Sequence, residues 1–183
     1  AEETMALTVE SGTGSATADS YISEANAITY LDKYAASGSS NVFTAASTAN
    51  AEIALRSATR TIDAMFAMRF KGSRLLGTQA LQWPRVGAVT NDNYAIDSDA
   101  VPALVKNATC ELALRFIADS TGHDTSRLTP DQENPGAILR EKLKADVVET
   151  ETEYGGASQQ KHYKIVADML APLLHSAGRV MLQ

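Results

Sequence analysis

The sequence has few of the features that mark a secreted or membrane-bound protein. Its one cysteine, Cys110, excludes an internal disulfide and lies within a helical apolar pattern, so we expect a buried thiol and a reducing compartment. No apolar run reaches the length of a membrane span, and the N-terminal residues lack the basic and then apolar layout of a signal peptide. We therefore expect no membrane partner.

Motifs for catalysis, metals and cofactors are also missing. His123, His162 and His175 are scattered, and none has the spacing of a metal ligand with another histidine, cysteine or carboxylate. The stretch 12–14, Gly-Thr-Gly, lacks the lysine and the strand-to-helix setting of a phosphate loop, and we interpret it as a flexible linker. There is no Gly-x-Ser-x-Gly elbow. The sequence predicts no enzyme, no metal and no cofactor.

Positive charge is scarce overall but locally concentrated. The 22 acidic residues outnumber the 16 basic ones and leave a net charge of −6, which argues against a protein that holds nucleic acid on a broadly basic surface. Between Arg56 and Arg85, however, six basic residues face one acidic residue, and much of the compensating acid lies between Asp119 and Glu153. This asymmetry suits contacts between subunits, and it is equally compatible with two unrelated solvated faces.

The composition is that of a mainly helical globular protein. With 183 residues, 44% hydrophobic and only 6% aromatic, the chain is long enough to bury a core without disulfides. We predict a single domain over 1–183, built as a small bundle of about four helices with a short β-hairpin or strand arm. Its parts are an extended N-terminal segment 1–20, an arm 139–154, and a C-terminal helix and tail 158–183.

Two early helices follow from caps and apolar spacing. Ser23 is placed to cap a helix that runs to Tyr34. A longer helix is predicted over 47–68, where apolar residues recur at steps of three and four. On that helix we expect Asp63 to pair with Arg60, three residues before it.

Two later helices carry proline signals. A buried helix is predicted from about Val101 to Phe116, with Ser98 and Asp99 as cap candidates and Pro102 in its first turn. The last helix should open at Ser158, and the proline at 172 predicts a kink or an end near Met169.

Between the helical segments lies the only tryptophan, Trp83, followed by Pro84 and Arg85. Proline disfavours the α region for the residue before it, so this segment is predicted to be extended or turning. We expect Trp83 to act as a structural anchor, because large aromatic side chains tend to be buried.

The hydrophobic period changes from helical to two within 139–154. Basic residues alternate along the first half (Arg140, Lys142, Lys144) and acidic residues along the second (Glu149, Glu151, Glu153). Opposite charges favour pairing, so the two halves either form a hairpin or pair with a neighbouring subunit. An isolated hairpin is marginally stable, and we favour completion by another copy of the chain.

In the order of these features the sequence resembles a family of tailed-phage proteins. The resemblance rests on Leu7 to Gly14, on 19–23 (Asp-Ser-Tyr-Ile-Ser), on 80–85 (Ala-Leu-Gln-Trp-Pro-Arg) and on 108–113 (Ala-Thr-Cys-Glu-Leu-Ala). It extends to about Leu174. Members are head-completion or head-to-tail connector (adaptor) proteins, and some are described as DnaT-like single-stranded DNA-binding proteins.

The resemblance implies a structural virion protein in the neck, between capsid and tail, made in the host cytoplasm. Such adaptors form a ring, usually a dodecamer, beneath the portal protein. They extend the channel through which double-stranded DNA passes without specific binding, and they dock a downstream neck or tail-terminator protein. We expect subunit contacts through the arm and portal docking through the C-terminal residues Leu173, Leu174, Arg179, Val180, Met181 and Leu182.

The alternative is a DnaT-like single-stranded DNA-binding protein. Its site would be a basic cluster that faces DNA or a partner, formed by Arg69, Lys71, Arg74 and Arg85. Trp83 and Phe70 would then provide a platform on which bases stack.

Overall fold

The computed structural model describes residues 6–34, 41–117, 138–144, 149–154 and 163–175. Within them it contains four α-helices, one 3₁₀ turn and two two-stranded antiparallel sheets. The prediction of a mainly helical protein with a short hairpin is confirmed. By its internal contacts the chain divides into two compact units, Ala1–Ser126 with Ile165–Gln183 and Arg127–Lys164.

Helix α1 (Glu24–Asp32) begins after the predicted cap Ser23, and α2 (Thr48–Phe66) begins within one residue of the predicted start at 47. The hydroxyl oxygens of Ser23 and Ser47 each accept a hydrogen bond from the backbone N–H three residues later, both at 3.3 Å. The buried residues of α2 include Ala51, Ala54 and Ala58, and the helix packs on α3.

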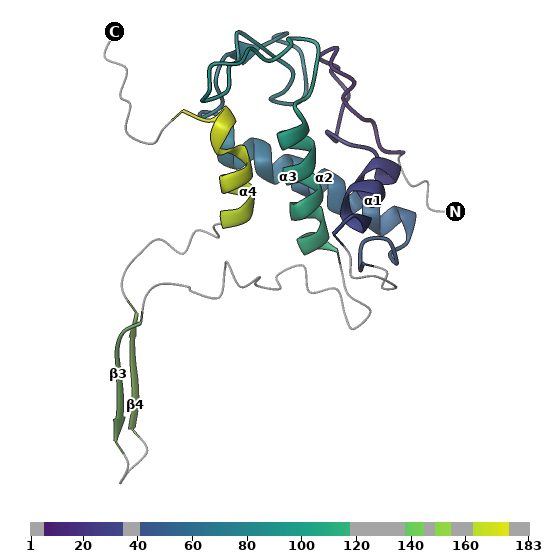
Figure 1. The fold of residues 1–183 in the computed structure, drawn as a ribbon. Helices are drawn as coiled ribbons and strands as arrows, with labels where there is room; N and C mark the ends of the chain where they lie inside the picture. Colours follow the sequence, from purple (N-terminus) through teal and green to yellow (C-terminus); the bar gives the residue numbers. More distant parts are fainter. Residues whose placement is uncertain (1–5, 35–40, 118–137, 145–148, 155–162, 176–183) are drawn as a thin grey trace, which may run out of the picture. The chain divides into compact units, whose positions relative to one another are not determined.

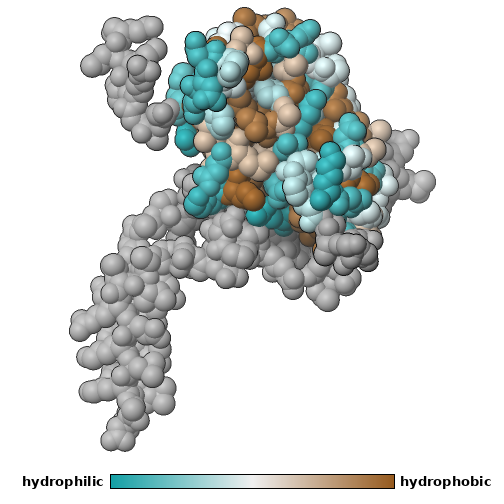
Figure 2. Space-filling view, viewed as in Figure 1, coloured by the Kyte–Doolittle hydropathy of each residue, from teal (hydrophilic) through white to brown (hydrophobic). Residues whose placement is uncertain are grey.

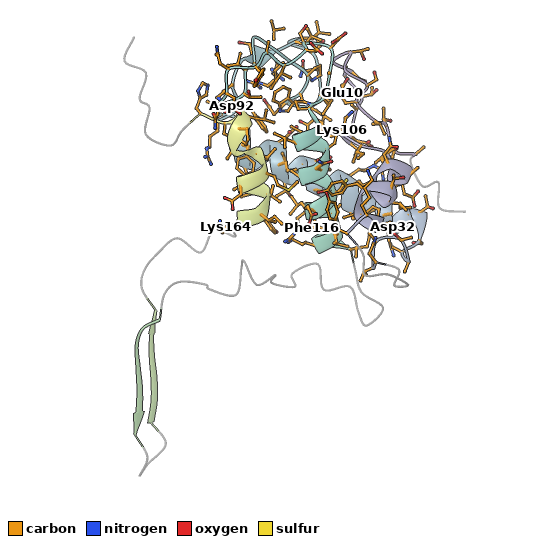
Figure 3. The ribbon with its side chains drawn as sticks, in the orientation of Figure 1. Glu10, Asp32, Asp92, Lys106, Phe116 and Lys164 are labelled. Atoms are coloured by element: carbon orange, nitrogen blue, oxygen red, sulfur yellow. The ribbon has the colours of Figure 1, made fainter. Side chains whose placement is uncertain are left out.

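Helix α3 (Ala103–Phe116) passes through the core, and Lys106 and Phe116 mark its two ends in Figure 3. It buries Val105, Ala108 and Leu112. Its N-cap is Pro102, and no side chain caps it, so the expectation for Ser98 and Asp99 was wrong. Both lie in a turn that precedes Pro102, too far before the first helical residue, Ala103, to reach its first backbone N–H groups.

The segment between α2 and α3 gathers at one end of these helices (Figure 1). It contains the short strands β1 (Ser73–Arg74) and β2 (Arg85–Val86), which pair with each other. Near the C-terminus, α4 (Lys164–Leu170) gives way to the 3₁₀ turn η1 (Ala171–Leu173). Pro172 lies in this turn, which explains why the α-helix ends at Leu170, next to the predicted position.

The second unit contains β3 (Ile138–Lys144) and β4 (Glu149–Tyr154), which pair antiparallel. The two strands therefore form a hairpin within one chain. Helix α4 begins at Lys164, with Tyr163 outside it, while Ser158, where the C-terminal helix was predicted to open, and the tail from 176 onward lie outside the described residues. The prediction of one domain over 1–183 stays a prediction.

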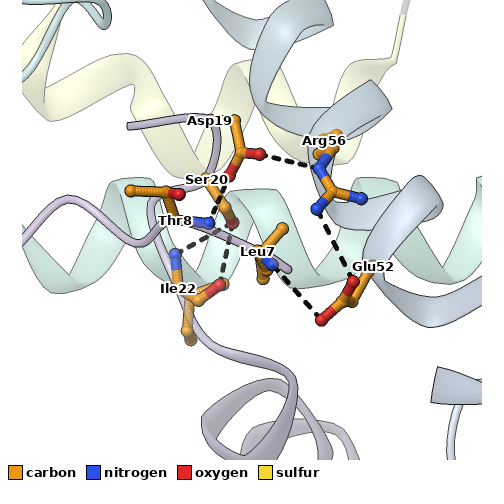
Figure 4. A network of polar contacts seen from close by, with 7 residues as sticks. All are labelled: Leu7, Thr8, Asp19, Ser20, Ile22, Glu52 and Arg56. Carbon is orange, nitrogen blue, oxygen red and sulfur yellow. Dashed lines mark hydrogen bonds and ion pairs between the residues drawn. The ribbon is translucent and has the colours of Figure 1, made fainter. Parts of the chain in front are cut away.

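The N-terminal segment is tied to α2 by a polar network (Figure 4). The carboxylate of Asp19 accepts hydrogen bonds from the backbone N–H of Thr8 at 2.8 Å and from the Arg56 guanidinium at 2.7 Å. Arg56 also forms an ion pair with Glu52 at 3.5 Å. These contacts join residues that are up to 45 positions apart, including Leu7, whose N–H lies 3.4 Å from Glu52.

Candidate functional site

Trp83 is fully buried, and the loop around it, residues 79–85, is held by ring packing and by hydrogen bonds. The indole packs edge-on against Phe70, with ring centroids 5.7 Å apart. The Trp83–Pro84 peptide bond is cis. Gln79, also buried, donates from its side-chain amide to the carbonyls of Leu81 at 2.7 Å and of Pro84 at 3.1 Å.

Arg85, at the end of this loop, is only 6% exposed. Its guanidinium donates to the main-chain carbonyls of Lys71 at 2.8 Å and Gly72 at 2.6 Å. Two further carbonyls, those of Phe70 and Gln82, lie at 3.3 Å and 3.2 Å. Burial lowers the pKa of the guanidinium from its ordinary value. Arg85 is therefore a structural cation that joins two loop segments.

The other members of the predicted basic cluster are closer to the surface. Arg69 lies over the ring of Phe66, 5.6 Å from its centroid. The Lys71 ammonium donates to the side chain of Asn91 at 2.6 Å and to a main-chain carbonyl at 3.2 Å. Arg74, in β1, is exposed, and it reaches the Gln79 carbonyl at 3.4 Å. Three surface cations thus lie around the loop, each with a contact inside the chain.

The expected stacking platform was wrong. Phe70 is 3% exposed and Trp83 is 0% exposed, so neither ring has a face open to a nucleobase. The physical reason is their mutual packing above the end of α2, where Phe66 also contacts Phe70. Base stacking on aromatic residues requires an accessible ring face.

The arm has a register that brings its opposite charges together along the backbone. Arg140 lies opposite Glu153, Lys142 opposite Glu151, and Lys144 opposite Glu149. A register irregularity separates Ile138 from Arg140. All six residues expected to form subunit contacts are therefore on paired strands of one hairpin.

The residues expected to dock a portal are divided by the structure. Leu173 and Leu174 are buried, at 1% and 4% exposure, and their backbone contacts hold this segment against residues 70 and 71. The carbonyl of Leu173 accepts from Lys71 N–H at 3.0 Å, and Leu174 bridges to Phe70. Their side chains are thus used inside the fold and offer no docking surface. Arg179, Val180, Met181 and Leu182 lie outside the described residues.

Sequence reasoning missed a buried polar network on α2. Asp63 does not pair with Arg60 as predicted; it accepts hydrogen bonds from the Tyr21 hydroxyl and from the backbone N–H of Gln82, the latter at 3.0 Å. Desolvation by burial raises the pKa of Asp63 to about 6, against these two hydrogen bonds, which lower it. Its partners are 42 and 19 residues away, so no local spacing revealed them.

The loop at 12–14 is ordered around a buried carboxylate, not a flexible linker as predicted. Glu10, labelled in Figure 3, accepts hydrogen bonds from the backbone N–H groups of Gly12 at 2.8 Å, Gly14 at 3.0 Å and Ser15 at 2.8 Å. Gly12 has a φ of 110°, and a Cβ there would lie 1.8 Å from the carbonyl oxygen of Asp99. A glutamate shortly before two glycines was the signal available in the sequence.

Other features of the described residues bear on the class of protein. Cys110 is buried as predicted, and desolvation raises the pKa of its thiol to about 12. None of the helices in the described ranges is long and apolar enough to cross a bilayer. No group of three potential metal ligands occurs in the same ranges. On the face in Figure 2, hydrophobic residues stand between hydrophilic ones over the helical body.

Comparison with known proteins gives a match to a protein family. A family model described as "Putative DnaT-like ssDNA binding protein" matches residues 5–183. Searches of curated proteins and of solved structures found no match. The match agrees with the DnaT-like part of the resemblance seen in the sequence, and no comparison supports its head-to-tail connector part. Because the match spans nearly the whole chain, the protein belongs to the family described as "Putative DnaT-like ssDNA binding protein".

Proposed function

We propose that this protein is a structural subunit of a phage neck, a head-to-tail connector that assembles with copies of itself beneath the portal. The observation that carries the proposal is the arm. It is a two-stranded hairpin with three oppositely charged register pairs, and neither strand has a second neighbour among the described residues. Since isolated hairpins are marginally stable, an added strand from a partner would complete the sheet.

The net charge of the whole chain favours the same proposal. A ring that lets DNA slide through its channel must not hold phosphates tightly, and a net charge of −6 limits such binding. The rings of Trp83 and Phe70 are buried, and the guanidinium of Arg85 donates hydrogen bonds to main-chain carbonyls. Three of the six residues expected to bind a DNA strand, Phe70, Trp83 and Arg85, are thus used to hold the loop together.

Light scattering on the purified chain, alone and mixed with the portal of the phage that encodes it, tests the proposal. We expect a mass many times that of one subunit, either for the chain alone or for the chain on the portal. A monomer that stays monomeric in both samples contradicts the proposal.

Binding of single-stranded DNA is the second candidate, and the family match favours it. The surface cations Arg69, Lys71 and Arg74 would then contact phosphates without base stacking. Fluorescence anisotropy of a labelled oligo-dT, titrated at several salt concentrations, measures this binding. Affinity that falls steeply with salt, and that weakens when Arg74 is replaced by alanine, would favour this candidate over the connector.

A further inference from the structure

The register of the hairpin places its charged residues in two columns, one on each strand. Residues two apart in a strand share a face, so Arg140, Lys142 and Lys144 lie in one column along β3. Their register partners on β4, the glutamates at 149, 151 and 153, form an acidic column on the same face. The hairpin therefore has one basic edge and one acidic edge.

Among the described residues, no further strand pairs with either edge of the hairpin. The sheet contains β3 and β4 alone among the described residues, so each strand has unpaired backbone N–H and C=O groups along its outer side. A second strand that pairs there brings its own charge column next to the one already present. The sign of the charges on the added strand then decides whether the pairing is favourable.

Symmetric pairing of two copies is disfavoured by these columns. A two-fold axis perpendicular to the sheet would place β3 beside the β3 of a second copy, with basic next to basic. The same axis at the other edge would place β4 beside β4, with acidic next to acidic. Like charges directly opposite each other on a sheet are destabilising. The charges therefore act against a closed dimer.

Head-to-tail pairing places each basic column beside an acidic column of the neighbouring copy. When hairpins of several copies stand side by side in the same orientation, β4 of one copy lies beside β3 of the next. Because the two strands of a hairpin run in opposite directions, this contact is antiparallel like the pairing observed within the hairpin. Acidic then meets basic at every contact, and a contact of this heterologous kind repeats around a ring.

We propose that the partner of the arm is a second copy of this chain, and that β3 of one copy adds to β4 of the next in a repeating head-to-tail sheet. This inference rests on the proposed function, because it names the contact that joins neighbouring subunits of the ring. The other face of the hairpin restricts the register. It carries Glu141 opposite Thr152 and Leu143 opposite Thr150, so a slip by one residue between copies would take the basic column of one copy out of line with the acidic column of the next.

A full charge exchange in the arm tests the pairing. The exchanged variant carries six substitutions: Arg140→Glu, Lys142→Glu, Lys144→Glu, Glu149→Lys, Glu151→Lys and Glu153→Lys. Within its own hairpin, and with copies of itself, opposite charges still meet. With the natural chain, however, acidic would meet acidic and basic would meet basic at every head-to-tail contact.

The experiment mixes the two chains with different affinity tags and counts mixed contacts in the assembled rings by native mass spectrometry. Rings are formed from the chain alone or on the portal, whichever condition assembles the natural chain. Two natural chains with different tags are the matched control and must mix in statistical proportion. Circular dichroism confirms that the exchanged variant is folded.

We expect each chain to assemble with its own kind, with mixed contacts depleted about tenfold or more by three mismatched pairs. Statistical mixing would overturn the inference, because the arm charges would then not meet between copies. Preferential mixing would also overturn it, since that result requires β3 beside β3. In both cases rings still form and the proposed function stands, whereas a chain that never assembles contradicts the proposed function and the inference together.

Discussion

Replacement of Arg85 by alanine distinguishes a structural cation from a DNA contact. The guanidinium donates to four main-chain carbonyls, from 70–72 and from Gln82, at distances between 2.6 and 3.3 Å. Alanine has no donor to replace any of them. The segment after α2 and the segment around Trp83 would lose their shared contact.

The expected loss can be estimated from the burial of these carbonyls. Phe70 is buried and Gly72 is exposed, so water replaces some of the lost hydrogen bonds but not all. A buried acceptor left without a donor costs roughly 1–3 kcal/mol, and we expect a total loss of about 3 kcal/mol in the free energy of unfolding. For a protein of this size, that corresponds to a decrease of about 6–12 °C in Tm.

Thermal unfolding followed by circular dichroism measures the change. Arg60→Ala is the matched control, because Arg60 is an exposed arginine on α2, and its replacement should change Tm little. Arg85→Lys should lie between the two, since an ammonium keeps the charge but cannot span the carbonyls as a planar guanidinium does. An Arg85→Ala protein that melts like the Arg60→Ala control, yet loses affinity for oligo-dT, would refute the structural role.

Three further outcomes follow from the body of the protein. Gly12→Ala should prevent normal folding or strongly lower Tm, because the new Cβ would meet a carbonyl oxygen at 1.8 Å. The control is Gly77→Ala, whose Cβ would meet nothing within 4 Å, so its effect on Tm should be nearly neutral. Thermal unfolding compares the two variants. The pKa of Asp63 is raised from 3.8 to about 6, so the folded state favours the protonated acid and loses stability as the pH rises from about 4 to about 6. Urea unfolding measures the free energy of unfolding across this pH range. Its decrease between about pH 4 and about pH 6 should be smaller for Asp63→Asn than for the natural chain, by roughly 2–3 kcal/mol. Trp83 is the only tryptophan and is fully buried, so its fluorescence should resist quenching by iodide and stay unchanged on addition of oligo-dT; strong quenching by either would contradict the buried ring.

Local sequence signals predicted the secondary structure well where the forces involved are local. Ser23 caps the helix that it was expected to cap, because an N-cap hydrogen bond spans only three residues. The alternation of charge in 139–154 predicted two strands, since the period of side chains along a strand is two. Burial of Cys110 followed in the same way from apolar residues at helical spacing.

The tertiary structure alone decided how the polar residues are used. The sequence left Arg85 as one member of a basic cluster, but the fold brings the carbonyls of 70–72 within reach of its guanidinium. Asp63 was assigned to a neighbour on its own helix, and burial instead joins it to Tyr21, 42 residues away. Glu10 had no predicted role until the loop wrapped its carboxylate. Helices and strands arise from contacts between near neighbours in the chain, whereas the partner of a buried charge is set by segments that meet only after folding, so the sequence determined the elements and the tertiary structure determined the polar contacts.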